Sequence, residues 1–417
     1  MNQLFKKIPQ DKLIEYIIIT FPLSFILGNA FVNLHMTFFL FYFVYNFSKI
    51  KSCFDKKLIL APLLIWFFLI FTTLFNNYPF NQDFNYQNII KSILYLRILI
   101  LPISLAFILY LYPNIKHRLL NFLILITLII SIDVIFQFNF GVNLINLYSA
   151  NHGMRNSSFF GSELISGSYL SKFLTLTVAY ILIFYTNFRK NYKYFIILIP
   201  IITILGILLS GERMAFLNAM FSLFILILLT KNKKIIIVTG FIVFLTTFSL
   251  SNSDNLKKRY IYNIGAHLIG VDNAEGLGIY KDIYKKLNQG IHAKIFTTSL
   301  QLSKDSLVIG KGIKSYRHEC IKFKKDNCST HPHNMFLELL HDAGIPLLLL
   351  FYYYFTLMII NIFKIKNKSY YDYAIIATLI TLVNPIQITG SVFSTWSASI
   401  MFFIFGLALI PNKNESE

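Results

Sequence analysis

Two histidines separated by one residue are the sharpest chemical feature of the sequence. They lie in Thr330-His331-Pro332-His333-Asn334, directly before a long apolar run. An imidazole has a pKa near neutral pH, so it can take a proton from a hydroxyl group. Pro332 suits the first turn of a helix, which predicts that His333 enters the helix that follows. Paired histidines can also bind a metal with His318, Glu319, Cys320 and Cys328 nearby, but the spacing fits no zinc pattern well.

An arginine between two apolar runs is the second feature. The segment Ser210-Gly211-Glu212-Arg213-Met214-Ala215 leaves almost no loop between these runs, so Arg213 lies at the mouth of a helix pair. A guanidinium group keeps its charge and binds phosphate oxygens through two parallel hydrogen bonds. Arg213 is therefore a candidate phosphate-binding residue. The alternatives are an ion pair with Glu212 and contact with lipid headgroups.

A glycine-containing segment, Val308 to Ser315, is only superficially similar to a phosphate-binding loop. Ile313 rather than Gly precedes Lys314, so the segment lacks the Gly-x-x-x-x-Gly-Lys-Ser/Thr spacing of such loops. Gly310 and Gly312 instead predict a turn whose backbone closely approaches another segment.

The composition requires that most of the chain faces lipid. Of its 417 residues 56% are hydrophobic and 14% charged, and the mean hydropathy is +0.60. A soluble domain cannot bury that much apolar surface in one core. The sequence therefore predicts an all-α, polytopic membrane protein, and the placement of the basic residues in short loops argues against nucleic acid as the reason for the net charge of +19.

Twelve apolar runs have the length of a membrane-spanning helix. The first is expected to be a retained helix rather than a signal peptide, because it lacks a small-residue cleavage site and another run follows at once. The runs cover residues 13–30, 31–48, 58–75, 93–112, 119–138, 168–187, 195–210, 213–230, 235–250, 335–361, 373–390 and 393–410.

The basic residues predict the orientation of these helices. With the N-terminus inside, half of the 38 Lys and Arg fall in the inward connections, whereas the short outward connections carry only Lys91, Arg155 and Arg213. Such a bias sets topology by the positive-inside rule. We therefore expect a multi-pass protein of the bacterial inner membrane whose active site faces the periplasm.

One outward connection, residues 251–332, is too long to be a turn and contains 14 Lys and Arg. It predicts a periplasmic loop domain with short amphipathic helices, such as Tyr280–Asn288 and Ala293–Lys304. The chain then divides into helices 1–9 over residues 1–250, the loop domain over 251–332, and helices 10–12 over 333–417. Cys320 and Cys328 both lie in this loop, where oxidation can join them, and the sequence leaves their pairing open.

Polar residues inside the predicted helices gather near the outer leaflet. Such residues are costly in a membrane and mark function by default. For any one of them the alternative is a side chain that reaches to the headgroups, but together they fit a basic cavity open to the outer face. They are His35, Arg97, Asp133, Gln137, Lys172, Arg213 and Gln387.

These elements together resemble the O-antigen ligase and polymerase superfamily, whose members transfer glycans from undecaprenyl diphosphate in the outer leaflet of the inner membrane. His333-Asn334 is followed by nine residues and then by Gly344-Ile345-Pro346-Leu347. This spacing is similar to the family's His-Asn element with its later Gly-x-x-small pattern. Leu347 departs from the pattern at the last position.

Three further segments carry the resemblance. Ser210 to Ala215 is similar to the family's Ser-x-x-Arg-x-Ala element, with Glu212 where a Ser is common. Arg155 to Gly161, leading into Gly167-Ser168-Tyr169-Leu170, is similar to its Arg-x-x-Gly stretch, and Gly310-x-Gly312 with Tyr316 matches the segment before the His. A further Arg is usual earlier in the large loop, ahead of an aromatic residue. The segment expected there is His292-Ala293-Lys294-Ile295-Phe296, so His292 or Lys294 would have to substitute.

The resemblance implies an inverting glycosyl transfer in which His333 deprotonates an acceptor hydroxyl and guanidinium groups stabilise the departing diphosphate. We expect no metal and no other cofactor, since the sequence has no Asp-x-Asp pair of the kind that holds a metal for nucleotide sugars. The implied partners are an undecaprenyl-diphosphate-linked glycan, a lipid A–core or second glycan acceptor, and membrane lipids. The implied substrate-binding residues are Arg213, Arg155, Arg317, Lys294, His292, Arg97, His331 and Asn334.

The acceptor separates the competing functions. Length and a single large loop late in the chain favour an O-antigen ligase, which uses lipid A–core. An O-antigen polymerase, which joins lipid-linked repeat units, is the first alternative, and a transferase to a protein hydroxyl is another. A polysaccharide transporter should place charges at the midplane and show internal repeats, and the sequence shows neither.

Overall fold

The chain is all-helical over the residues that its structure, a computed structural model, describes: 10–76, 86–149, 154–184, 193–262, 291–323, 328–385 and 387–411. Its main helices are α1 (Gln10–Leu27), α2 (Asn29–Tyr45), α3 (Phe47–Cys53), α4 (Lys56–Asn76), α5 (Tyr86–Leu94), α6 (Leu96–Leu99), α7 (Leu101–Leu111), α8 (Pro113–Phe140), α9 (Ser166–Phe184), α10 (Lys193–Leu209), α11 (Arg213–Thr230), α12 (Lys233–Asn252), α13 (Asp254–Leu256), α16 (Ile291–Ser303), α17 (Tyr316–Phe323), α18 (Met335–Phe363), α19 (Tyr370–Leu382) and α20 (Thr395–Ala408). A π-helical turn, η3 (Lys257–Tyr262), follows α13.

A helix lies over each of the twelve predicted runs. Among the described residues six helices are long and apolar enough to cross a membrane, or seven if the bent pair α2 and α3 is one span. Twelve crossings therefore stay a prediction. In the loop domain α16 confirms the helix predicted over Ala293–Lys304, whereas Tyr280–Asn288 lies outside the described residues.

Two predicted spans end elsewhere than the sequence indicated. The fourth begins at Tyr86 rather than at residue 93, so Arg97 lies deeper in it than predicted. The eleventh, predicted to run to residue 390, ends as a helix at Leu382, and α20 begins only at Thr395. Gln387 consequently lies in a loop, residues 383–394, and not at the end of a helix.

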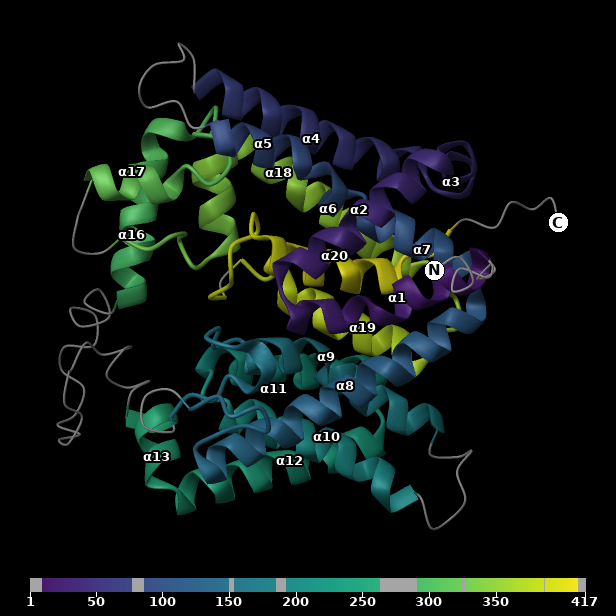
Figure 1. Ribbon diagram of the computed structural model, residues 1–417, viewed down its shortest axis with the longest axis vertical. Helices are drawn as coiled ribbons and strands as arrows, with labels where there is room; N and C mark the ends of the chain where they lie inside the picture. Colours follow the sequence, from purple (N-terminus) through teal and green to yellow (C-terminus); the bar gives the residue numbers. More distant parts are fainter. Residues whose placement is uncertain are drawn as a thin grey trace, which may run out of the picture.

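The helices form two groups (Figure 1). Helices α8 to α12 make up one group, and the other contains α1, α2, α4 to α7 and α18 to α20. The groups meet where α9 and α11 pack against α19 and where α1 packs against α8. Helices α16 and α17 lie at one end of the bundle and α3 lies at the other (Figure 1).

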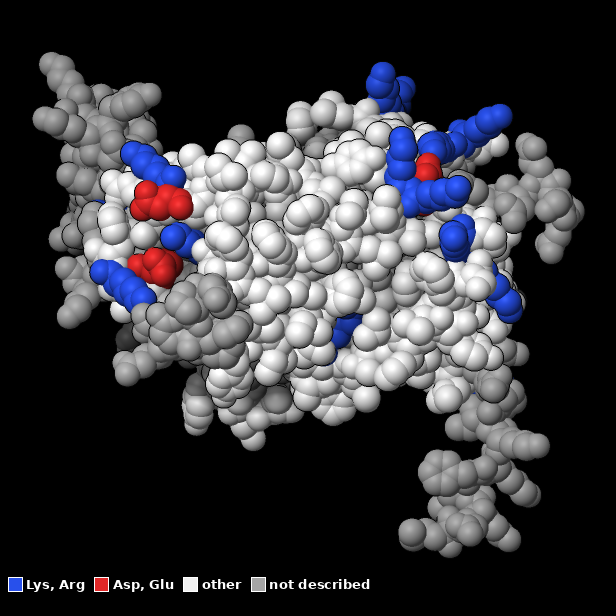
Figure 2. Space-filling view, turned by 90° about the horizontal axis from the view of Figure 1, so that it is seen from above, with Lys and Arg blue, Asp and Glu red and all other residues white. Residues whose placement is uncertain are grey.

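Charged residues gather at the same two ends on the face shown in Figure 2, and a wide band with little charge separates them. The end that carries α3 is rich in Lys and Arg. Many large apolar side chains of the spanning helices are exposed, among them Phe67, Phe71, Phe244 and Phe248. Exposed aromatic residues at such density are typical of a surface that faces lipid.

Helix α18 is broken in its N-terminal half, at Gly344. This residue has a left-handed φ of 76° inside the helix, and Pro346 follows it. Because proline has no backbone N–H, the carbonyl of Asp342 loses its usual helical donor. The N–H of Ile345 donates to the carbonyl of Leu307 at 2.8 Å instead of to His341. Two buried carbonyls of α18, those of His341 and Asp342, therefore need donors from elsewhere.

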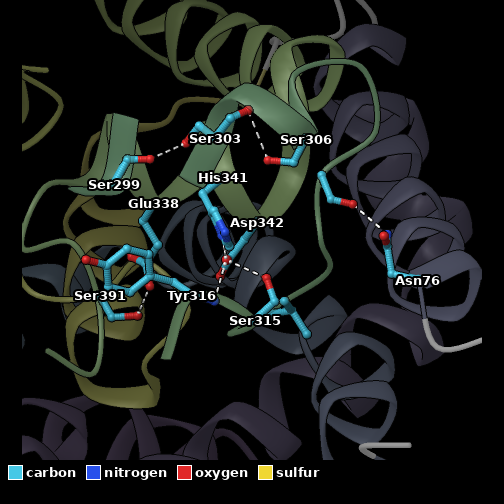
Figure 3. Close-up of polar contacts among 12 residues, drawn as sticks. Asn76, Ser299, Ser303, Ser306, Ser315, Tyr316, Glu338, His341, Asp342 and Ser391 are labelled. Carbon is cyan, nitrogen blue, oxygen red and sulfur yellow. Dashed lines mark hydrogen bonds and ion pairs between the residues drawn. The ribbon is translucent and has the colours of Figure 1, made fainter. Parts of the chain in front are cut away.

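The glycine turn predicted from the sequence supplies these donors. The N–H of Lys311 donates to the carbonyl of His341 at 3.0 Å, and the N–H of Gly312 donates to that of Asp342 at 2.9 Å. A Cβ at Gly310 would lie 2.3 Å from the carbonyl oxygen of Asp342, so only glycine permits this approach. The Asn76 amide of α4 donates to the Gly310 carbonyl at 2.6 Å and holds the turn from its other side (Figure 3).

A buried polar cluster lies beneath this turn (Figure 3). The carboxylate of Asp342 contacts Nδ1 of His341 at 2.8 Å and accepts from the Ser315 hydroxyl at 2.9 Å and the Tyr316 N–H at 3.1 Å. His341 and Asp342 are fully buried. The cluster fixes the start of α17 against α18, so its role in the fold is to anchor the loop domain.

We expect Gly310→Ala to destabilise the protein by at least about 2 kcal/mol, because its Cβ would overlap backbone atoms that cannot move without breaking the turn. Gly240→Ala in α12 is the matched control, since a Cβ there meets no atom within 4 Å. The control should be neutral or stabilise its helix. The thermal unfolding midpoint of each variant in detergent tests the prediction, and equal midpoints would contradict it.

Candidate active site

A cavity of about 540 Å³ opens where the two helix groups meet. One wall comes from the α8 to α12 group and its loops and carries Arg155, Lys172, Glu212, Arg213 and Arg259. The opposite wall carries His331, His333, residues 387–390 of the loop and the side chain of Trp396. The cavity therefore brings together the histidine pair and two of the predicted phosphate-binding arginines, from segments up to about 180 residues apart.

Three arginines form the basic wall. Arg213 is the first residue of α11. Nη2 of Arg155 donates to the Leu164 carbonyl at 3.0 Å, and Nε of Arg259 donates to the Gly211 carbonyl at 2.7 Å. Burial and the charge of Arg155 lower the pKa of Arg259 below its usual value. The guanidinium groups thus lie close enough to repel one another, and this wall favours an anion.

Backbone contacts hold the segments that carry these arginines together. The Asn156 N–H donates to the Ser210 carbonyl at 3.1 Å, and its side-chain amide donates to the Leu209 carbonyl at 2.6 Å. Gly211 has a φ of 73°, and a Cβ there would lie 1.9 Å from the Met154 carbonyl oxygen. The loop of Arg155 is therefore fixed to the turn that precedes Arg213.

The carboxylate of Glu212 accepts from the N–H groups of Gly167 and Ser168, at 2.7 and 3.2 Å. These amides begin α9, where the helix dipole favours a negative charge. Burial nevertheless raises the pKa of Glu212 to about 7, against the opposing effect of Arg155 and Lys172. Glu212 thus binds a helix N-terminus, which the sequence did not predict.

The histidine pair lies outside the helix that the sequence predicted for it. Helix α18 begins at Met335, and His333 has a left-handed φ of 54° two residues earlier. The His333 carbonyl accepts from the Thr389 N–H at 2.8 Å, and its ring lies 4.2 Å from the ring of His331, centroid to centroid. His333 lines the cavity from this left-handed position, just outside α18.

Asn334 is the N-cap of α18 and also holds the opposite loop. Its Oδ1 accepts from the Leu337 N–H at 2.9 Å, while its amide donates to the carbonyls of Pro385 and Gln387 at 2.7 and 3.0 Å. Buried Glu338, one turn further, accepts from Ser391 and from the Val392 N–H. Asn334 thus positions the histidine wall and does not line the cavity among the described residues.

Both imidazoles have lowered pKa values and are therefore neutral at neutral pH. Burial lowers the pKa of His333 below 6.5. Burial and the neighbouring His333 lower the pKa of His331 to about 4. A neutral imidazole accepts a proton, so either ring can act as a base at neutral pH.

A disulfide fixes the other end of the histidine segment. Cys320 in α17 is bonded to Cys328, which resolves the pairing that the sequence left open. The bond removes both thiols from any metal site that would include the histidines. Among the described residues no group of three or more His, Cys, Asp or Glu side chains is arranged to hold a metal ion.

Several residues predicted for the site lie elsewhere. Arg97 donates from Nη2 to Asn33 at 2.8 Å, and Lys294 is exposed on α16. Arg317, in α17, is also absent from the described cavity lining, and the side chain of His292 lies outside the described residues.

Two of the polar residues predicted to lie near the outer leaflet stabilise the fold. Asp133 and Gln137 of α8 are buried and bind the loop at Ser158: the Asp133 carboxylate accepts from its hydroxyl, and Oε1 of Gln137 accepts from its N–H. Lys172 of α9, by contrast, lines the cavity, with Nζ 5.2 Å from the centroid of the Trp396 ring.

Arg259 is the cavity residue that the sequence analysis missed. It lies in the run Lys257-Lys258-Arg259-Tyr260, where three adjacent cations gave no reason to select one. The available signal was the aromatic residue that follows it, since the expected large-loop Arg precedes an aromatic. Tyr260 is buried and donates to the Leu208 carbonyl at 2.7 Å, which fixes Arg259 at the cavity. Arg259 thus lies at the cavity, whereas Lys294 lies outside the described lining.

Comparison with known proteins bears on the segments that build this cavity. Residues 198–352 match the sequence model of the O-antigen ligase family. The match includes Arg213, Arg259, His331 and His333. No curated protein matches the chain. The match covers this part of the chain and supports its relation to the O-antigen ligase superfamily of glycosyltransferase-like enzymes.

Proposed function

We propose that the chain is an O-antigen ligase, which transfers a glycan from undecaprenyl diphosphate to lipid A–core. The observation that carries the proposal is the cavity in which three arginines face a pair of neutral histidines. Such an arrangement suits a reaction that combines a polyanionic leaving group with a hydroxyl nucleophile. The family match supports the same class of reaction.

The reaction follows from these groups. The donor diphosphate binds Arg155, Arg213 and Arg259, whose charges are already in place before the reaction. His333 takes the proton of an acceptor hydroxyl, and the oxygen attacks the anomeric carbon from the side opposite the diphosphate. The new C–O bond forms as the bond to the diphosphate oxygen breaks, so the anomeric centre inverts. The electron pair leaves with the diphosphate, where the arginines stabilise it.

The proposed location is the inner membrane with the cavity facing the periplasm. The charge of the loops supports this orientation, since the end with α3 is rich in Lys and Arg and the end with α16 and α17 is opposite (Figures 1 and 2). The disulfide in the loop domain agrees with an oxidising compartment. A lipid-linked donor then reaches the cavity from the outer leaflet.

Arg259 rather than Lys294 should bind the donor. Arg259→Ala removes a charge-assisted contact to the diphosphate and should lower kcat/KM for the donor about 30- to 100-fold. Lys294→Ala, the matched control from the same loop, should stay within about twofold of the parent protein. Transfer measured with purified protein and a lipid-linked glycan checks both, and the reverse order of effects would return the assignment to Lys294.

The fall of kcat at low pH, the acid limb of the pH–rate profile, should reflect protonation of His333. Because burial lowers the pKa of His333, it gains a proton only below pH 6.5, and kcat should hold at neutral pH and fall below 6.5. Glu212 also titrates in this range, so the profile is measured at saturating donor in Glu212→Gln as well, which should keep the limb. His333→Gln should lose the limb and about 10²- to 10⁴-fold in kcat. A limb that persists in His333→Gln contradicts the assignment.

The acceptor is tested in the cell. In a strain from which the gene is deleted, a ligase predicts lipopolysaccharide whose core carries no glycan at all. Core that carries a single repeat unit would instead indicate a polymerase. The band pattern on a gel separates the two results, and complementation by His333→Gln should fail to restore the missing bands.

A further inference from the structure

A second basic cluster lies outside the cavity lining. It consists of Lys91 in α5, Lys314 in the turn before α17, and Arg317 in α17, whose charges act on one another. The turn is fixed on both sides of Lys314: the Ile313 N–H donates to Thr73 of α4 at 3.3 Å, and Ser315 donates to Asp342. Lys314 itself has a left-handed φ of 58°. A non-glycine residue held in this region marks a position that the surrounding structure determines.

The cluster has an excess of positive charge. Burial and the charges of Lys91 and Arg317 lower the pKa of Lys314 to about 8, and these neighbours outweigh the attraction of Glu338 and Asp342. Both carboxylates are already engaged, Glu338 by the loop at Ser391 and Asp342 by the start of α17. The cations are thus not balanced by the acidic residues beside them.

Arg317 adds an unsatisfied donor. Its Nε is buried and has no hydrogen-bond partner, although a buried polar group without one is costly. The other side chains of the cluster carry positive charge and cannot accept this bond. An anion placed between Arg317 and Lys314 would accept it and would also relieve the repulsion.

The cluster lies within electrostatic range of the reaction. The charges of Arg317 and Lys314 contribute to the low pKa of His331, although burial and His333 contribute more. The Cys320–Cys328 bond links α17 to the segment that leads to the histidines. His331 therefore experiences positive charge from this cluster as well as bordering the arginine-lined cavity.

We propose that Lys91, Lys314 and Arg317 form a second anion subsite, which binds a phosphate group of the acceptor glycolipid. The inference rests on the proposed function, in which the arginine cavity takes the donor diphosphate and leaves the acceptor as the second substrate. A phosphate bound to this cluster would anchor the acceptor while its hydroxyl reaches His333. The phosphate can belong to a phosphorylated lipid A–core or to a lipid-linked repeat unit, and both present the same chemistry.

The test compares acceptors with and without phosphate. Purified protein in nanodiscs, with the donor cavity disabled by Arg213→Ala and Arg259→Ala, is titrated with phosphorylated lipid A–core, with the same molecule after removal of its phosphates, and with an undecaprenyl-diphosphate repeat unit. The double variant Lys314→Gln/Arg317→Gln should weaken binding of a phosphorylated acceptor about 10- to 100-fold. Binding of the dephosphorylated acceptor should not change. Lys304→Gln, an exposed residue of the same domain, is the matched control, and Arg317→Lys keeps the charge and should retain most of the binding.

The outcomes are separable. Loss of binding confined to lipid A–core identifies its phosphates as the ligand, and loss confined to the repeat unit identifies the diphosphate; both support the subsite. Unchanged binding of both, or equal loss for the dephosphorylated acceptor, overturns it and assigns the cluster to balancing Glu338 and Asp342. Absence of transfer by the parent protein, with phosphate-dependent binding intact, would refute the proposed function and not the subsite.

Discussion

The loop domain depends on two backbone carbonyls of α18 that lack helical donors. A membrane interior offers no water to satisfy them, so a break at Gly344 and Pro346 is tolerated only where another segment donates to these oxygens. The turn at Gly310–Gly312 does so, and it brings the start of α17 onto Asp342. The disulfide then holds Cys328 to α17. The histidine segment is consequently fixed at one end by this bond and at the other by the cap at Asn334.

A second constraint acts on the arginines that line the cavity: like charges held close together repel one another. Arg155 and Arg259 each donate to a backbone carbonyl, so their guanidinium groups keep their positions despite mutual repulsion. The stabilisation of a departing diphosphate is largest when the charges need not move during the reaction. The contacts at Gly211 and Asn156 hold the loop of Arg155 against the turn before Arg213, although the two are distant in sequence.

The sequence predicted most of what depends on local pattern. The apolar runs located the helices, and Gly310 with Gly312 predicted a close backbone approach that the structure confirms. The run predicted from residue 335 matches the start of α18, but the expectation that His333 enters this helix is wrong, since its backbone is left-handed and Asn334 is the N-cap. The eleventh run was extended too far, because Asn384, Pro385 and Gly390 already indicate the end of a helix. The described residues there form a loop that Asn334 holds through the carbonyls of Pro385 and Gln387. Arg259 was missed because its neighbours carry the same charge.

Charge couples the two sides of the reaction. Without substrate, burial keeps both imidazoles neutral, and the cations of the second cluster add to this effect at His331. An imidazole with a low pKa is unprotonated at neutral pH and so can accept a proton. Its low pKa also means that it binds the proton weakly, so it is a poor base. A diphosphate in the arginine cavity brings negative charge beside the histidines, which favours the protonated imidazole and raises its pKa. In the proposed reaction the base therefore strengthens when the donor is in place, so deprotonation of an acceptor hydroxyl is promoted only when there is an anomeric carbon for it to attack.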